Sequence, residues 1–151
     1  MKRPLTPFRT ALAAATLALS GAAFAAAPPA DPAKARHEAM EHVGDAMKVL
    51  GKMAKGQAAF DAAAVGNNAT TIKEHLEEAA KLFPPGSDTG ETKARPEVWS
   101  DRPGFEQAMK DAQAAAVALQ AVKDEAAFRP ALGALGQSCK ACHDKYRMSE
   151  H

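Results

Sequence analysis

The sequence predicts an all-α domain folded as an antiparallel four-helix bundle with one covalently bound haem c. From Asp31 onward the chain is rich in Ala, Lys, Glu and Met and shows no sustained alternating strand pattern. Four segments repeat apolar residues at steps of three and four, and a bundle buries such seams together. A Cys-x-x-Cys-His motif close to the C-terminus predicts the haem.

The first 25 residues are predicted to be a cleaved secretory signal peptide, with 27 as an alternative cleavage position and 26–151 as the bundle domain. A basic start precedes a stretch of mostly Ala, Leu and Phe that ends in small-x-small sites. Polar residues interrupt this stretch, which falls short of the roughly 20 apolar residues of a spanning helix. We therefore expect export to the periplasm, without membrane insertion of the mature chain.

The charge of the mature chain excludes one class of partner. Loss of the leader removes Lys2, Arg3 and Arg9, which leaves 16 basic and 18 acidic residues and a net charge of about −2. No basic run with interleaved aromatic residues is present in the sequence. We therefore expect no nucleic-acid partner.

The first helix is predicted to begin after Asp31, a capping residue followed by Pro32 at the first helical position, and to end before Gly56. One face of this helix is expected to form a seam. Its members are Ala33, Arg36, Met40, Val43, Met47, Leu50 and Ala54.

The second helix is predicted over residues 68–83, where the Pro-Pro-Gly sequence at 84–86 ends it. Its seam is Ile72, Leu76, Ala79 and Phe83. A long connection with Pro96 and Trp99 then runs to Arg102. Its length favours a crossover packed along the bundle over a tight turn.

The third helix is predicted to start after Asp101, and Asp124 is predicted to cap a fourth that continues to about Met148. Pro130 predicts a kink in the fourth helix, or a start nearer Phe128. The third helix carries an apolar stripe of Phe105, Met109, Ala112, Ala116 and Leu119. Because Ala dominates the seams, we expect the cofactor to complete the core.

The motif Cys139-Lys140-Ala141-Cys142-His143 is typical of haem attachment. On a helix the two thiols share one face, where they can form thioethers with the haem vinyl groups, and the histidine can bind the iron. A thioredoxin-like centre would need a strand before the motif, and a zinc site would need two further ligands. We therefore predict attachment through Cys139 and Cys142 and iron ligation by His143.

The residues leave the ligand on the other side of the iron open, and Met40 is the first candidate. His143 lies about 7 Å from the end of its helix and Met40 about 12 Å from the start of the antiparallel first helix, so their heights agree. Met47 lies about 10 Å further along. His42 points to nearly the opposite side, whereas His37, about 60° off the seam, remains a competitor. Because methionine at helical spacing is often core filler, coordination stays open.

Three stretches of sequence carry a family resemblance. They are the attachment motif followed by Asp144-Lys145-Tyr146-Arg147, the segment Ala94-Arg95-Pro96-Glu97-Val98-Trp99-Ser100-Asp101, and the segment Val49-Leu50-Gly51-Lys52-Met53-Ala54-Lys55-Gly56. From about Ala33 to Arg147 the chain resembles the class II c-type cytochromes, the cytochrome c′ and cytochrome c-556 family, which are four-helix bundles. Members of class I instead attach their haem near the N-terminus.

The resemblance places the family's distal position on Met40. In cytochrome c′ that residue leaves the iron five-coordinate, able to bind nitric oxide or carbon monoxide, whereas in cytochrome c-556 a methionine ligates it. The first-helix sequence is more similar to the c-556 group. We therefore expect a periplasmic electron carrier with low-spin iron bound by His143 and Met40, and keep the gas-binding cytochrome c′ as the alternative.

The resemblance also implies roles for two arginines and for partners. It implies that Arg36 lies near the haem propionates and that Arg147 shields the proximal imidazole, against the alternatives of a solvated terminal arginine and a cation favouring a helix C-terminus. Redox partner proteins and a homodimer through the first two helices are implied in the same way. No enzymatic activity is expected, because the distal face offers no placed acid–base pair.

Overall fold

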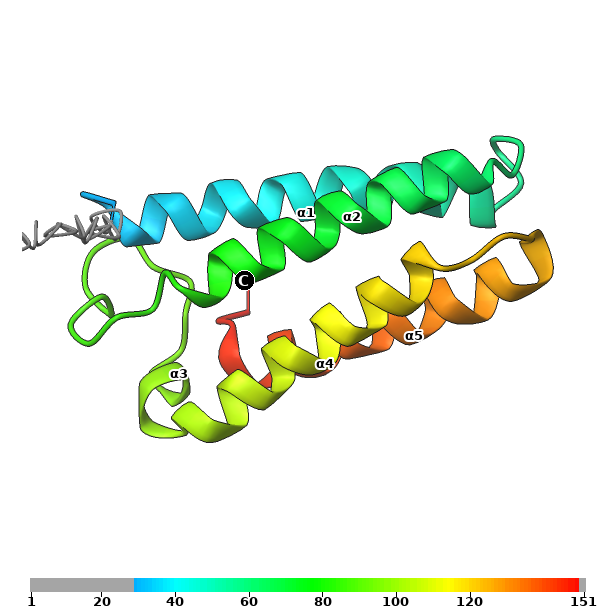
Figure 1. Ribbon diagram of the computed structural model, residues 1–151. Coiled ribbons are helices and arrows are strands. Elements are labelled where there is room, and N and C mark those ends of the chain that lie inside the picture. Colours follow the sequence, from blue (N-terminus) through cyan, green and yellow to red (C-terminus); the bar gives the residue numbers. More distant parts are fainter. Residues whose placement is uncertain (1–28, 150–151) are drawn as a thin grey trace, which may run out of the picture.

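The structure, a computed structural model, describes residues 29–149, so the predicted signal peptide and both of its cleavage positions lie outside the described residues. Within that range the chain forms α1 (Pro32–Ala54), α2 (Ala62–Ala80), α3 (Glu97–Ser100), α4 (Arg102–Gln120) and α5 (Glu125–Tyr146). The four long helices run antiparallel to their sequence neighbours, with α1 beside α2 and α4 beside α5 (Figure 1). The predicted all-α bundle is confirmed.

An aspartate caps the N-terminus of every long helix. Asp31, Asp61, Asp101 and Asp124 each accept a hydrogen bond from a backbone N–H two or three residues further on. Such a cap satisfies an N–H group that has no partner within the helix, and its loss costs about 1 kcal/mol. The caps at Asp31 and Asp124 were predicted from the sequence, and Asp101 was predicted as the residue after which the third helix starts. The cap at Asp61 was not predicted.

Both predicted ends of the second helix and one predicted start of the fourth are wrong. The second helix begins at Ala62, ahead of the predicted residue 68, because Asp61 provides an earlier cap, and it ends at Ala80, before Phe83. The fourth long helix starts at Glu125 and continues through Pro130, so the alternative start near Phe128 is also wrong. The cap at Asp124 fixes that start. Pro130 lies inside this helix, and the predicted kink there stays a prediction.

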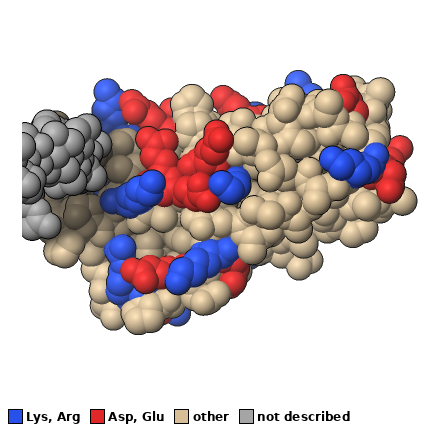
Figure 2. Space-filling model, in the orientation of Figure 1, with Lys and Arg blue, Asp and Glu red and all other residues tan. Residues whose placement is uncertain are grey.

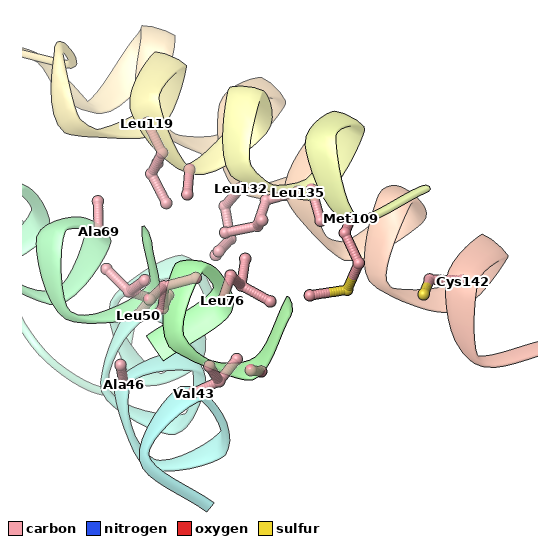
Figure 3. Packing of buried hydrophobic residues seen from close by; sticks show 14 of the residues in the cluster. Val43, Ala46, Leu50, Ala69, Leu76, Met109, Leu119, Leu132, Leu135 and Cys142 are labelled. Atoms are coloured by element: carbon pink, nitrogen blue, oxygen red, sulfur yellow. The ribbon is translucent and has the colours of Figure 1, made fainter. Parts of the chain in front are cut away.

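The core lies between the α1–α2 pair and the α4–α5 pair. Figure 3 shows Val43 and Leu50 from α1 and Leu76 from α2 directed toward Leu132 and Leu135 on α5. The predicted stripe of α4 is buried in full. In α1, however, the most buried apolar residues are Ala39, Val43, Ala46, Leu50 and Met53, so that Met40 and Met47 lie half-buried at the edge of the core.

The connection between α2 and α4 folds over one end of the bundle, where α1 begins and α2 ends (Figure 1). The expected course along the bundle is therefore wrong, because the end of α2 and the start of α4 lie at the same end. Trp99 Nε1 donates to the Pro84 carbonyl at 3.1 Å, and Arg102 Nη1 donates to the Phe83 carbonyl at 2.8 Å. These bonds hold the connection against the helix ends.

The surface carries both signs of charge. Figure 2 shows Lys and Arg side chains interspersed with Asp and Glu over the face turned to the viewer, without a broad field of one sign. Several of these side chains form ion pairs at helical spacing, among them Lys73 with Glu77 and Arg102 with Glu106. Among residues 29–149 no helix combines the length and apolar character that crossing a bilayer demands.

Asp101 joins the start of α4 to the end of α5. Besides capping α4, its carboxylate accepts hydrogen bonds from Lys145 Nζ and, at 2.9 Å, from the Tyr146 hydroxyl. The bond from Lys145, followed by that from Tyr146, lowers the pKa of Asp101. Gly104 packs against this cluster so closely that a Cβ atom there would lie 2.6 Å from the Tyr146 hydroxyl and closer still to Asp101.

We expect Gly104→Ala to destabilise the holoprotein by about 1–3 kcal/mol, because the added methyl group must displace the Asp101–Tyr146 hydrogen bond. Gly133→Ala is the matched control. A Cβ atom at Gly133 in α5 meets nothing within 4 Å, and alanine is the better helix former by up to about 1 kcal/mol. Urea denaturation measures both. Equal unfolding free energies for the two variants would contradict the close packing at Gly104.

We expect the stability difference between wild type and Asp101→Asn to depend on pH. Asparagine keeps the capping ability but loses the charge. Because folding lowers the pKa of Asp101, the ionic contribution is present above the unfolded-state pKa and disappears as the pH falls through the folded-state pKa. The difference in unfolding free energy should therefore be largest near neutral pH and shrink below about pH 4. A difference that stays constant from neutral to acidic pH would exclude the ionic contribution.

Candidate functional site

The predicted attachment motif lies in the last turns of α5. Cys139 is half-buried and Cys142 is buried, and both are free thiols. Because they are three residues apart on one helix, their side chains share a face. Figure 3 shows the sulfur atoms of Cys142 and Met109 entering the same part of the core, from α5 and α4 respectively. The thiols therefore open onto the interior of the bundle.

The electrostatics of the two thiols argue against a dithiol redox centre. Burial raises the pKa of Cys139, and burial together with the neighbouring Cys139 raises the pKa of Cys142 to about 11. Both thiols therefore stay protonated at neutral pH. Reactive redox cysteines and zinc ligands need thiolates, which their surroundings stabilise by lowering the pKa. The site thus fits attachment of a cofactor better than either alternative.

His143 follows the second cysteine at the exposed end of α5. The protein around the ring lowers the pKa of His143 chiefly through desolvation, and the nearby positive charge of Arg147 lowers it further. The imidazole is therefore held in its neutral form, which is the form that binds iron. Arg147 is the C-cap residue of α5, and its backbone N–H donates to the His143 carbonyl at 3.0 Å. Its predicted shielding of the proximal imidazole stays a prediction.

The candidate distal methionines lie on α1. Met40 and Met47 are both half-buried and pack against the core, seven residues and therefore two turns apart. The thioether of Met40 therefore lies at the surface of the core. It is carried by α1, which runs antiparallel to α5. Its ligation of iron stays a prediction.

The two histidines of α1 face away from the core. His37 is exposed, and its Nε2 lies 3.4 Å from a carboxylate oxygen of Glu41. His42 is exposed and stacks on His75 of α2, with ring centres 4.4 Å apart and planes inclined by 17°. The predicted orientation of His42 is confirmed. The role of His37 as a competing ligand stays a prediction.

Arg36 is buried, so the alternative of a solvated terminal arginine is wrong. Its Nη1 donates to the Leu82 carbonyl at 2.8 Å and to the Ser87 hydroxyl at 3.2 Å. Its Nη2 donates to the Ser87 carbonyl at 3.0 Å and to Thr92 Oγ1 at 2.9 Å. The guanidinium carbon also lies 4.8 Å from the centre of the Phe83 ring. Sequence reasoning missed these partners. The predicted role of Arg36 near the haem propionates stays a prediction. None of the four hydrogen bonds above uses its Nε–H group, which could donate to a propionate.

The residues present fit a haem c. The donor set is two protonated thiols on adjacent turns with a neutral imidazole beside them. Gly136 precedes Cys139 by one turn and Gly44 follows Met40 by one turn, and a Cβ atom at either glycine would meet nothing within 4 Å. Residues 29–149 contain no group of three or more His, Cys, Asp or Glu side chains suited to a bare metal ion. Cys139 and Cys142 would hold a haem through its vinyl groups, and His143 would bind its iron.

Comparisons with known proteins converge on one family. The family model described as cytochrome c′ matches residues 31–147. Cytochrome c′ of Rhodopseudomonas palustris is 36% identical over 135 residues, covering 88% of this chain and 92% of the relative. Cytochrome c-556 of Agrobacterium tumefaciens is 35% identical over 117 residues, covering 76% and 95% respectively.

Solved structures agree with the sequence relatives. The crystal structure of cytochrome c′ from Rubrivivax gelatinosus superposes with a TM-score of 0.72 at 34% identity, covering 78% of this chain and 98% of that one. The nitric oxide complex of a variant of cytochrome c prime from Alcaligenes xylosoxidans gives a TM-score of 0.75 at 36% identity, covering 82% and 98%.

We expect the double substitution Cys139→Ser and Cys142→Ser to abolish covalent haem binding, because a hydroxyl group cannot form the thioether. Ala141→Ser, at the exposed position between the two cysteines, is the matched control and should keep the haem. Haem staining after denaturing electrophoresis of the exported protein measures both. Staining of the double variant at wild-type intensity would refute attachment through these sulfur atoms.

Proposed function

The chain belongs to the cytochrome c′ family, and from that membership we propose that it is a periplasmic mono-haem cytochrome that binds nitric oxide or carbon monoxide at a five-coordinate iron. The covalently attached haem c is the cofactor of this family. The match over residues 31–147, which includes the Cys139–His143 motif, carries the proposal. The relatives named cytochrome c′, one of them solved with nitric oxide, favour this alternative over the expected His/Met electron carrier.

The chain's own residues hold the cofactor from one side. When bound, haem supplies an iron that changes oxidation state and takes an axial ligand. Cys139 and Cys142 fix it to α5, and His143 presents a neutral imidazole to the metal. Asp101 and Tyr146 tie the end of α5 to α4, so that the imidazole sits on a fixed helix end.

The face of α1 that carries Met40 offers an apolar surface for the side of the haem opposite His143. Met40, Val43, Gly44 and Met47 share this face, and none of them titrates. A wall of this kind excludes water and ions but admits a small neutral gas. These four side chains supply no acid–base group of the type that peroxidase chemistry needs, and the guanidinium of Arg36, one turn before Met40, is bonded to the connection between α2 and α4, which supports a carrier or binding protein over an enzyme.

A second function is supported by the identity of residue 40. Met40 is half-buried at the core surface, and a thioether is a stable sixth ligand in electron-carrying cytochromes. The c-556 relatives at similar identity support this candidate as well. In that case the protein cycles between ferric and ferrous iron with redox partner proteins.

The location and assembly belong to the same proposal. We place the mature protein in the periplasm, on the strength of the signal peptide expected in the first 25 residues and of a haem attachment motif. A homodimer through α1 and α2 remains a prediction from the family resemblance.

Visible absorption spectra of the purified protein, with and without carbon monoxide, test the proposed function. We expect a high-spin ferric spectrum and uptake of carbon monoxide by the ferrous protein. Met40→Ala should then retain the high-spin spectrum and raise carbon monoxide affinity by about tenfold, because the side chain crowds the distal side. Met47→Ala, two turns away on the same face, is the control.

The opposite result would favour the electron carrier. A low-spin wild type without carbon monoxide uptake, which becomes high-spin in Met40→Ala, would assign Met40 as the sixth ligand. Low-spin ligation that persists in Met40→Ala would instead point to Met47 or His37.

A further inference from the structure

The two helices that carry the proximal ligand and the candidate distal residue are not fixed to each other by broad packing. Each long helix packs extensively against its sequence neighbour, whereas α1 and α5 make few direct contacts. The separation of these two helices decides whether Met40 reaches the iron. Their separation therefore depends on packing through α2 and α4 and on the connection that joins those two helices.

A four-residue segment of the connection, Thr92–Arg95, is bonded to both helices. We call this segment the strap. On the α1 side, Thr92 Oγ1 accepts a hydrogen bond from Arg36 Nη2 at 2.9 Å. The same oxygen accepts from the Ala94 backbone N–H at 3.1 Å. One hydroxyl group therefore fixes both the buried guanidinium and the turn of the strap.

On the α5 side, the strap forms a short antiparallel bridge with the residues that follow the helix. The Arg95 N–H donates to the Tyr146 carbonyl at 2.9 Å, and the Met148 N–H donates to the Lys93 carbonyl at 2.8 Å. Both bonds run between backbone groups. This makes the end of α5 and the strap a single hydrogen-bonded unit.

The strap is short, so it can lengthen only a little. The residues to which it is bonded, Arg36 and Tyr146, lie close in sequence to the predicted axial ligands. Three residue steps span at most about 11 Å even when fully extended. Arg36 lies one helical turn before Met40, and Tyr146 lies about one turn after His143. A change in how the strap is held would therefore move the helices on the two sides of the iron relative to each other.

We propose that the strap sets the separation of α1 and α5 at the haem, and thereby how closely Met40 approaches the iron, with Thr92 as its positioning residue. The proposal rests on the proposed function and specifies how its sixth coordination position is controlled. Four of the five N–H groups of Arg36 are already bonded, two of them to carbonyls and two to hydroxyls. Removal of the Thr92 hydroxyl leaves a buried guanidinium N–H and the Ala94 N–H without an acceptor, so the strap must rearrange.

The test is Thr92→Val in the holoprotein, a substitution that keeps the shape of the side chain and removes the hydroxyl. We expect a mixture of spin states in the ferric absorption spectrum and a change in carbon monoxide affinity of at least about threefold. A five-coordinate wild type should gain a low-spin fraction, and a six-coordinate wild type should gain a high-spin fraction. Faster amide hydrogen exchange at Arg95 and Met148 should accompany either change.

Two further variants separate positioning from general loosening. Thr92→Ser retains the hydroxyl and should restore the wild-type spectrum. Thr70→Val makes the same chemical change on α2, where Thr70 Oγ1 accepts from Gln120 Nε2 at 2.6 Å near the opposite end of the bundle. It should lower stability without altering the spin state.

An unchanged spectrum and carbon monoxide affinity in Thr92→Val overturn the proposal, whatever the hydrogen exchange shows. The same spectral change in Thr70→Val also overturns it, since the effect would then be general. A wild type that is low-spin and takes up no carbon monoxide contradicts the proposed gas-binding function alone, because a gain of high-spin iron in Thr92→Val would still report the strap.

Discussion

The buried guanidinium of Arg36 is the interaction on which one end of the bundle depends. A charge withdrawn from water is costly unless its N–H groups find acceptors, and Arg36 finds them in carbonyls and hydroxyls of the connection between α2 and α4. That requirement folds the connection over the end of the bundle. The connection in turn bonds to the residues after α5. A single side chain of α1 thus organises contacts that reach the helix carrying the cofactor motif.

The sequence predicted those parts of the structure that local chemistry determines. The caps at Asp31 and Asp124, the helix start after Asp101 and the Cys-x-x-Cys-His motif depend on residues within one or two turns, so their positions could be assigned directly. The start of α2 was missed because Asp61 was not recognised as a cap. The partners of Arg36 lie 46 to 56 residues away in the chain, and no local pattern specifies such pairs.

The same distinction divides the candidate site. The proximal side follows from five consecutive residues on one helix, whereas the distal side depends on the distance between two helices that are remote in sequence. A methionine at position 40 is compatible both with a gas-binding protein and with an electron carrier. We propose that its role depends on the separation of α1 and α5, which neither the residue type nor its helical phase encodes. Under the proposal that the strap sets this separation, the choice between gas binding and electron transfer in this chain depends on the spacing between helices more than on ligand identity.

The burial of the two thiols bears on the order of biogenesis. In the closed bundle Cys142 is buried and Cys139 is half-buried against the core, so a porphyrin has little room to approach both sulfur atoms. Addition to the vinyl groups therefore belongs to a more open chain, before the helices close. During maturation, the haem would then be attached covalently to a chain that is not yet fully folded. The four helices would afterwards pack around the tetrapyrrole.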